Sequence, residues 1–156
     1  MKQEDKELLF KDLCSRLPYN TIVSMAEGEI DFIECKIKWN KEELTLSLLH
    51  QIKEDGAWEF VKPYLCPMTS MTEVEAKEIS ILYGLKDILS TKITDEYIEV
   101  VVDDNVCSTE KRTIWYNEIV SSIEIFDWLN AHHFDYRGLI PKDLAIEVTE
   151  ENNPYK

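Results

Sequence analysis

The sequence lacks the short motifs that usually allow an enzymatic activity to be assigned. It contains no glycine-rich nucleotide-binding loop, no metal-ligand spacing, no nucleophile elbow and no close cysteine pair. Its four cysteines are widely separated, which excludes half of a zinc or redox motif: Cys14, Cys35, Cys66 and Cys107. We therefore expect free thiols, no metal ion, no cofactor and no catalytic residue that spacing alone identifies.

Basic residues and long apolar runs are also scarce. Lys and Arg total 17 against 31 Asp and Glu, which gives a net charge of −14. A charge of this size repels phosphate backbones and anionic membrane surfaces, and it favours encounters with basic partners. No apolar run approaches the roughly 20 residues of a membrane span, and residues 1–7 lack the apolar core of a secretory signal. We expect a cytoplasmic protein that contacts neither nucleic acid nor membrane directly.

Glycine and proline are few, and this favours a folded chain. The 156 residues include four Gly, five Pro and 44% hydrophobic side chains, a composition typical of a globular protein. A chain of this length buries roughly 70% of the surface that its unfolded form exposes, so one core is sufficient. The sequence predicts a single domain over residues 1–150, with residues 151–156 as a frayed tail.

Apolar spacing and capping patterns predict three main helices. Leu9, Leu13 and Leu17 recur at helical spacing and predict a helix over residues 4–17. The segments Ser70–Glu73 and Ser121–Glu124 each have the spacing of a capping box, so helices should run from them to about Tyr83 and His133. Pro141 predicts a short closing helix over residues 142–146.

Segments rich in β-branched and aromatic residues predict a sheet. Residues 21–25 and 30–39 form one predicted hairpin, and residues 96–103 and 111–117 form a second. Further strands are expected at 44–50 and 58–61, followed by an extended connector over 62–67 that its two prolines stiffen. The predicted fold is α+β, with a mostly antiparallel sheet of about four to six strands and three main helices packed on it.

The residues around the end of the last long helix are the best candidates for chemistry. His132, His133 and Asp135 carry groups that bind transition metals, although adjacent helical residues point about 100° apart. The alternative interpretation is that one His packs at the helix C-terminus, where it interacts favourably with the last carbonyl groups. Asp135, Tyr136 and Arg137 are suited either to binding a small polar ligand or to forming a helix-terminating turn with a salt bridge.

Two segments resemble a known group of proteins. Lys-Pro-Tyr-Leu-Cys-Pro-Met-Thr-Ser-Met-Thr at 62–72 and Asp-Trp-Leu-Asn-Ala-His-His-Phe-Asp-Tyr-Arg-Gly-Leu-Ile at 127–140, continuing to Ala145, resemble an uncharacterised family of small acidic proteins from prophages and other mobile elements of gut bacteria. The sequence departs from that family at Cys66, where Arg is expected, and at Asp143, where Gly is expected. The resemblance implies a bacterial or phage accessory protein and supplies no catalytic residue.

These observations favour a non-enzymatic, acidic protein-binding module whose partner has a basic surface. The candidate interaction or ligand surface mixes aromatic, soft and cationic side chains as interface centres do: Tyr64, Met68, His132, His133, Asp135, Tyr136 and Arg137. The alternatives are a small-molecule or metal-dependent enzyme centred on residues 132–137, and an inhibitor that mimics DNA phosphates. We also expect the 62–67 connector and the 132–138 turn to lie near each other.

Overall fold

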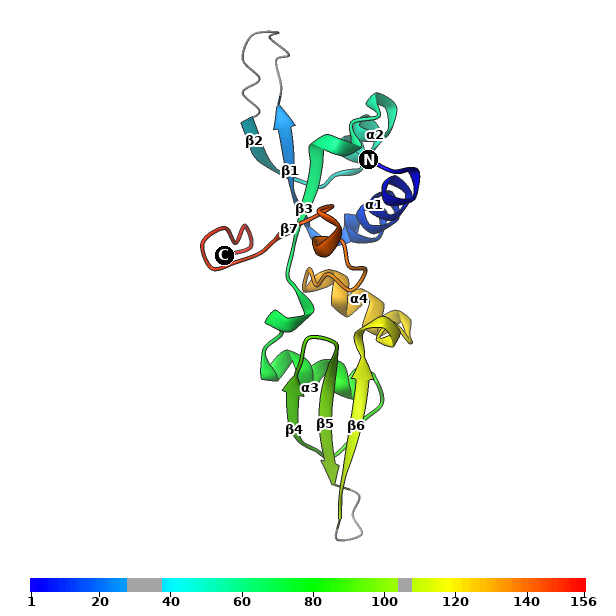
Figure 1. The fold of residues 1–156 in the computed structure, drawn as a ribbon, viewed down its shortest axis with the longest axis vertical. Coiled ribbons are helices and arrows are strands. Elements are labelled where there is room, and N and C mark those ends of the chain that lie inside the picture. Colours follow the sequence, from blue (N-terminus) through cyan, green and yellow to red (C-terminus); the bar gives the residue numbers. More distant parts are fainter. Residues whose placement is uncertain (28–37, 104–107) are drawn as a thin grey trace. The chain divides into compact units, whose positions relative to one another are not determined.

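The computed structural model describes residues 1–27, 38–103 and 108–156 (Figure 1). These residues form two compact units: unit 1 comprises residues 1–65 and 138–156, and unit 2 comprises residues 66–137. The single domain predicted over residues 1–150 stays a prediction, because two compact units can still fold together. Most of the predicted strand at 30–39 lies outside the described residues. Within the described ranges, no helix is both long enough and apolar enough to cross a membrane.

Unit 1 contains a four-stranded sheet. Its strands are β1 (Ile22–Glu27), β2 (Lys38–Glu43), β3 (Val61–Leu65) and β7 (Ile146–Glu147), in the order β2-β1-β3-β7. β1 pairs antiparallel with both β2 and β3, whereas β7 pairs parallel with β3. The predicted 62–67 connector is extended as expected, but most of it is the central strand β3. Pro63 is tolerated there because β7 pairs only with the two residues that follow it.

Two helices complete unit 1: α1 (Gln3–Arg16), as predicted, and α2 (Leu46–Asp55). The prediction of a strand over 44–50 is wrong. The Thr45 hydroxyl accepts a hydrogen bond from the Leu48 N–H, and Gly56 ends the helix with a φ of 66°. Leu49 and Ile52 face the core, whereas Leu46, which created the apparent strand alternation, is 72% exposed.

The C-terminal residues of unit 1 are hydrogen-bonded to the sheet, although the sequence predicts that they fray. The Tyr155 hydroxyl donates to the Tyr64 carbonyl oxygen over 2.8 Å and accepts from the Ile22 N–H over 3.3 Å. The Asn152 carbonyl oxygen accepts from Lys41 Nζ over 3.1 Å. These contacts fix the end of the chain against β1, β2 and β3, because each of the three strands contributes one bonding residue.

Unit 2 has the element order α3 (Glu73–Leu82), β4 (Ile88–Ile93), β5 (Tyr97–Asp103), β6 (Thr109–Trp115) and α4 (Ile123–Ala131). The strands form an antiparallel sheet in the order β4-β5-β6, and α3 crosses behind it (Figure 1). The predicted second hairpin is confirmed as β5 and β6. Its core face alternates along β5 and packs against both helices through Ile98, Val100, Val102, Ile79, Ile125 and Leu129.

The capping residues at the starts of α3 and α4 are of the predicted type, but they lie one or two residues later than predicted. The capping box of α3 uses Thr72 and Glu75 in place of Ser70 and Glu73, because Ser70 lies in a 3-10 helix and its hydroxyl donates to the Pro67 carbonyl oxygen. The cap of α4 is Ser122 in place of Ser121. The predicted closing helix over 142–146 is wrong, because Asp143 has a φ of 57° and ends a single turn. The 3-10 helices are Leu17–Tyr19, Trp58–Phe60, Met68–Ser70, Tyr116–Glu118 and Ile140–Lys142.

The fold class is α+β, as the sequence predicts. Among the described residues there are four α-helices and seven strands, which are divided between a four-stranded and a three-stranded sheet. Both sheets are mostly antiparallel, and each has its own hydrophobic cluster. The prediction of about four to six strands in one sheet therefore matches the larger sheet, which has four.

Candidate functional site

The backbone after α4 forms a tight helix-terminating turn. The Phe134 N–H donates to the Leu129 carbonyl oxygen over 3.0 Å, and the His133 N–H donates to that of Asn130 over 3.1 Å. This pair of hydrogen bonds, with His133 at a φ of 58°, is a Schellman motif in which His occupies the position that glycine usually takes. The motif turns the chain so that residues 133–135 run beside Cys66.

Cys66 fixes the far side of this turn within unit 2. Its N–H donates to the His133 carbonyl oxygen over 2.9 Å, and its carbonyl oxygen accepts from the Asp135 N–H over 2.8 Å. The two segments thereby form an isolated parallel bridge between Cys66 and Phe134. The end of the predicted connector and the predicted turn thus lie side by side at Cys66, whereas Tyr64 belongs to unit 1 and is not placed by these contacts.

The His132 side chain packs at the C-terminus of α4. Its ring stacks on that of Trp128 with 3.9 Å between centroids, and its Nδ1 lies 2.8 Å from the Trp128 carbonyl oxygen. Trp128 in turn stacks on Phe134, and its Nε1 donates to Glu78 of α3 over 3.3 Å. This is the helix-end packing that the sequence offers as the alternative to metal ligation. Within the described ranges, no three His, Cys, Asp or Glu side chains gather as metal ligands would.

Tyr136 and Arg137 form a chain of contacts that ends on α4. Arg137 Nε donates to the Tyr136 hydroxyl over 3.1 Å, and that hydroxyl donates to Oδ1 of the buried Asn130 over 3.2 Å. The Arg137 guanidinium also lies over the rings of Tyr136 and Phe126, with 5.1 and 5.8 Å between its Cζ and the ring centroids. Both side chains are half-buried, so they help to hold the turn and also present part of their surface to solvent.

Three other predicted site residues are buried. Tyr64 is 8% exposed in unit 1, where Lys41 Nζ lies 5.1 Å from its ring centroid. Met68 is 7% exposed and belongs to the core of unit 2 with Leu129 and Phe134. Asp135 is also buried. These side chains therefore contribute little to an accessible surface, because their neighbours already cover them.

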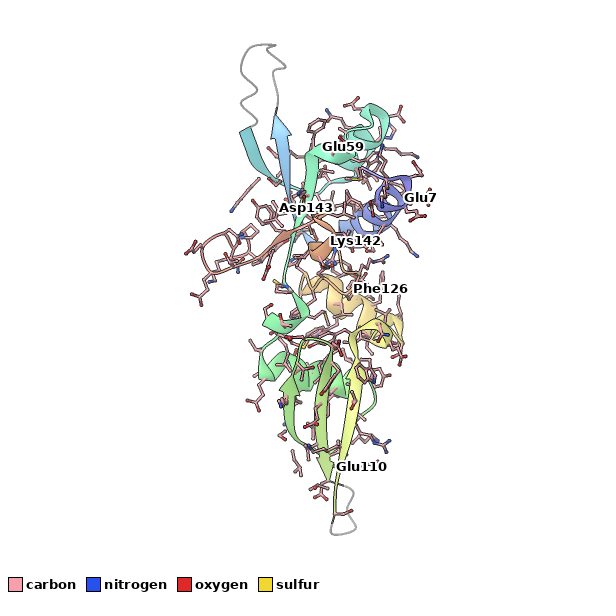
Figure 2. All side chains as sticks on the ribbon, in the orientation of Figure 1. Glu7, Glu59, Glu110, Phe126, Lys142 and Asp143 are labelled. Atoms are coloured by element: carbon pink, nitrogen blue, oxygen red, sulfur yellow. The ribbon has the colours of Figure 1, made fainter. Side chains whose placement is uncertain are left out.

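The accessible part of the site lies beside Arg137, at the N-terminal half of α4. Val120 is 43% and Ile123 64% exposed, and together with Phe126 they line a shallow cavity of about 400 Å³. Phe126 packs edge-on against Tyr136 with 6.0 Å between centroids. We call this group the Phe126 surface, after the residue labelled in Figure 2: Val120, Ile123, Phe126, Tyr136 and Arg137.

Carboxylates surround the Phe126 surface in the sequence of α4 and the turn before it. Glu118, Glu124 and Asp127 are all exposed. The pKa of Glu124 is lowered by a backbone N–H at the helix start and by the Ser122 hydroxyl, which keeps this carboxylate ionised. The surface therefore has an apolar and aromatic centre with one guanidinium, and three exposed carboxylates are close to its residues in the sequence.

Of the residues in the Phe126 surface, Tyr136 and Arg137 belong to the predicted site, whereas Val120, Ile123 and Phe126 do not. For Ile123 and Phe126 a signal exists in the apolar pattern of α4. Ile125 and Leu129 mark one face of the helix, while Ile123 and Phe126 are apolar residues outside it, so the helix has more apolar surface than one buried face requires.

Comparison with known proteins yields no family model, curated protein or solved structure that matches the chain.

Proposed function

We propose that the chain is a non-enzymatic acidic binding module that docks on a protein with a basic surface, and that the Phe126 surface is the centre of the contact. The resemblance of residues 62–72 and 127–145 to small acidic proteins of prophages favours a bacterial or phage accessory system for this module. The partner is a protein because the net charge of −14 opposes association with nucleic acid and anionic membranes.

The observation that carries the proposal is the composition of the Phe126 surface. Two aliphatic side chains are exposed beside Phe126, Tyr136 and Arg137, and aromatic residues and Arg are the types most enriched at the centres of protein interfaces. The exposed carboxylates close to it in the sequence repel acidic proteins and attract basic ones, which raises the association rate with a basic partner. An apolar centre accompanied by carboxylates thus selects a partner by both shape and charge.

The contacts of the 132–137 turn favour docking over an enzymatic role. His132 is stacked on Trp128, His133 occupies the left-handed position of the turn, and Asp135 is buried. A catalytic group has to reach a substrate atom within hydrogen-bond distance, directly or through one water. Side chains that hold a helix end together are less suited to that task than to supporting a neighbouring surface.

The test uses exposed residues, because truncating Tyr136 would also remove its hydrogen bond to Asn130. The tagged full-length chain, the double variant Val120→Ser/Ile123→Ser and a control variant Val74→Ser serve as baits in lysate of a gut bacterium. Val74 is a matched control because it is 68% exposed on α3 of the same unit. Surface changes of this kind alter stability by less than about 0.5 kcal/mol, so all three baits should share one melting temperature.

We expect a partner of high isoelectric point that the wild type and Val74→Ser retain and that the double variant loses. Raising the salt concentration should weaken its retention, because the charges at the rim of an interface are screened. Equal retention by all three baits would place the contact elsewhere and contradict the proposal, as would a partner whose retention is independent of salt.

A further inference from the structure

A second cavity of unit 2 combines aromatic rings with carboxylates. It has a volume of about 400 Å³ and is lined by Asp95, Glu96, Trp115, Tyr116 and Asn117. Its residues come from the turn between β4 and β5 and from the end of β6, which the β5–β6 pairing brings together. The Trp115 ring packs edge-on against Tyr97 with 4.9 Å between centroids, and 44% of the residue remains exposed. We call it the Trp115 pocket.

The walls of the Trp115 pocket are fixed by hydrogen bonds. The Tyr116 hydroxyl donates to the Thr94 carbonyl oxygen over 3.0 Å, and the Tyr116 N–H donates to the Glu96 carbonyl oxygen over 3.0 Å. The Thr94 hydroxyl accepts from the Tyr97 N–H over 3.1 Å, which closes the turn that carries both carboxylates. The pocket is therefore organised before any ligand arrives, and this lowers the entropic cost of binding.

Two carboxylates, those of Asp95 and Glu96, line the pocket. Asp95 and Glu96 are exposed, and neither forms an ion pair with a residue in the described part of the chain. Burial, and secondly the charge of Asp95, raise the pKa of Tyr116 to about 12. Asp95 and Glu96 line the pocket together with Trp115 and Tyr116, so a cation held there would lie near carboxylates and aromatic rings.

We propose that the Trp115 pocket binds the guanidinium group of an arginine side chain, and that this arginine belongs to the basic partner that docks on the Phe126 surface. A guanidinium stacks on an aromatic face and also pairs with carboxylates through its planar donors. An ammonium group pairs with carboxylates but has no planar surface with which to stack. The assignment of the arginine to a protein partner rests on the proposed function. The pocket and the surface are linked by a short segment, since Asn117 and Val120 are three residues apart.

The chemistry of the pocket can be tested without the partner. The full-length chain, labelled with ¹⁵N, is titrated with N-acetyl-argininamide while the indole N–H signal of Trp115, assigned with the variant Trp115→Phe, is followed. The double variant Asp95→Asn/Glu96→Gln removes both charges and keeps the side-chain shapes. Glu110→Gln is the control, because Glu110 is an exposed carboxylate at the opposite end of β6 from α4 (Figure 2).

We expect a saturable shift of the Trp115 signal, with affinity about fivefold to tenfold weaker in the double variant and unchanged in Glu110→Gln. N-acetyl-lysinamide should bind more weakly than the arginine probe. Equal weakening in Glu110→Gln would mean that net charge alone attracts the probe, and an unmoved Trp115 signal would mean that the pocket takes no guanidinium; either result overturns the proposal.

The proposed docking surface and the proposed arginine pocket can be refuted independently of each other. If the arginine probe binds but Val120→Ser/Ile123→Ser still retains every protein that the wild type retains, the pocket stands and the proposed docking surface fails. If the docking surface holds and the probe leaves Trp115 unmoved, the pocket proposal alone fails. If both hold, Asp95→Asn/Glu96→Gln should also lower retention of the partner about fivefold to tenfold.

Discussion

The buried ion pair of α1 allows a sharp prediction about stability. Arg16 Nε donates to Asp12 Oδ2 over 2.7 Å, and neither side chain is exposed at all. Leu9 and Leu13, which are also fully buried, occupy the same helix and belong to the core of unit 1. An ion pair in such a place loses its hydration, and its net contribution to stability depends on what replaces it.

Removing one partner breaks the ion pair and leaves the other charge buried. Asp12→Ala and Arg16→Ala should each lower the free energy of unfolding by about 3–5 kcal/mol, the range for a broken buried pair. A typical domain has a total stability of about 5–15 kcal/mol, so each single variant should lose a large share of its stability. The double variant Asp12→Leu/Arg16→Met replaces both charges with apolar groups of similar length and should be more stable than either single variant.

The assay is urea denaturation followed by circular dichroism, with the m-value checked for each variant. Glu7→Ala is the control, because Glu7 accepts an exposed hydrogen bond from Gln3 at the same four-residue spacing on α1; its midpoint should match the wild type. If each single variant costs under about 1 kcal/mol, or if the double variant loses the sum of the two, the pair does not behave as a desolvated unit and the reasoning is refuted.

Two further predictions concern ligands. Because the Trp128 stack holds His132 at the helix end, elemental analysis of protein purified without chelator should show no stoichiometric transition metal; one equivalent of zinc or iron that is lost in a His132 variant would contradict this. A gel shift near physiological salt should show no binding to duplex DNA or RNA, because the net charge is −14. A saturable, salt-sensitive shift would reveal a local basic face.

Elements whose residues alternate or repeat over their full length could be predicted from the sequence. In β5 the alternation of Ile98, Val100 and Val102 with more exposed residues matches one buried face, and α1 has its apolar residues at helical spacing. In such elements the apolar residues that recur at the period of the helix or strand are the same residues that make the core contacts.

Elements that depend on a partner were missed or misassigned. β4 carries a bulge between Ile88 and Ser90, so its residues do not alternate, and its strand character comes from pairing with β5. β7 has two residues and exists only beside β3. At the start of α2 the alternation of Leu44, Leu46 and Leu48 predicts a strand. The Thr45 cap and Gly56 instead define a helix, and Leu46 is exposed as a result.

The candidate site also has features that could be predicted from local sequence and features that depend on long-range packing. That residues 132–138 form a helix-terminating turn follows from local chemistry, and the structure shows this turn through the contacts of His133 and Phe134. The salt bridge predicted for Arg137 stays a prediction. The burial of Tyr64 and Met68 depends on long-range packing, which sequence spacing does not contain. For the same reason the Trp115 pocket could not be predicted, because Asp95 and Trp115 meet only through the register of the β5–β6 hairpin.

The Phe126 surface and the Trp115 pocket are joined by a segment that holds them at a nearly fixed distance. Ile119, between them, is fully buried, its N–H donates to the Tyr116 carbonyl oxygen, and its own carbonyl oxygen accepts from Ser121. Three peptide links span at most about 11 Å, so Asn117 and Val120 cannot be farther apart than that. One helix or hairpin of a partner is long enough to place an apolar side chain against Ile123 and an arginine in the pocket. Simultaneous occupation would make the second contact intramolecular, so removing the pocket charges should weaken the whole complex by the same factor as it weakens binding of the arginine probe, about fivefold to tenfold.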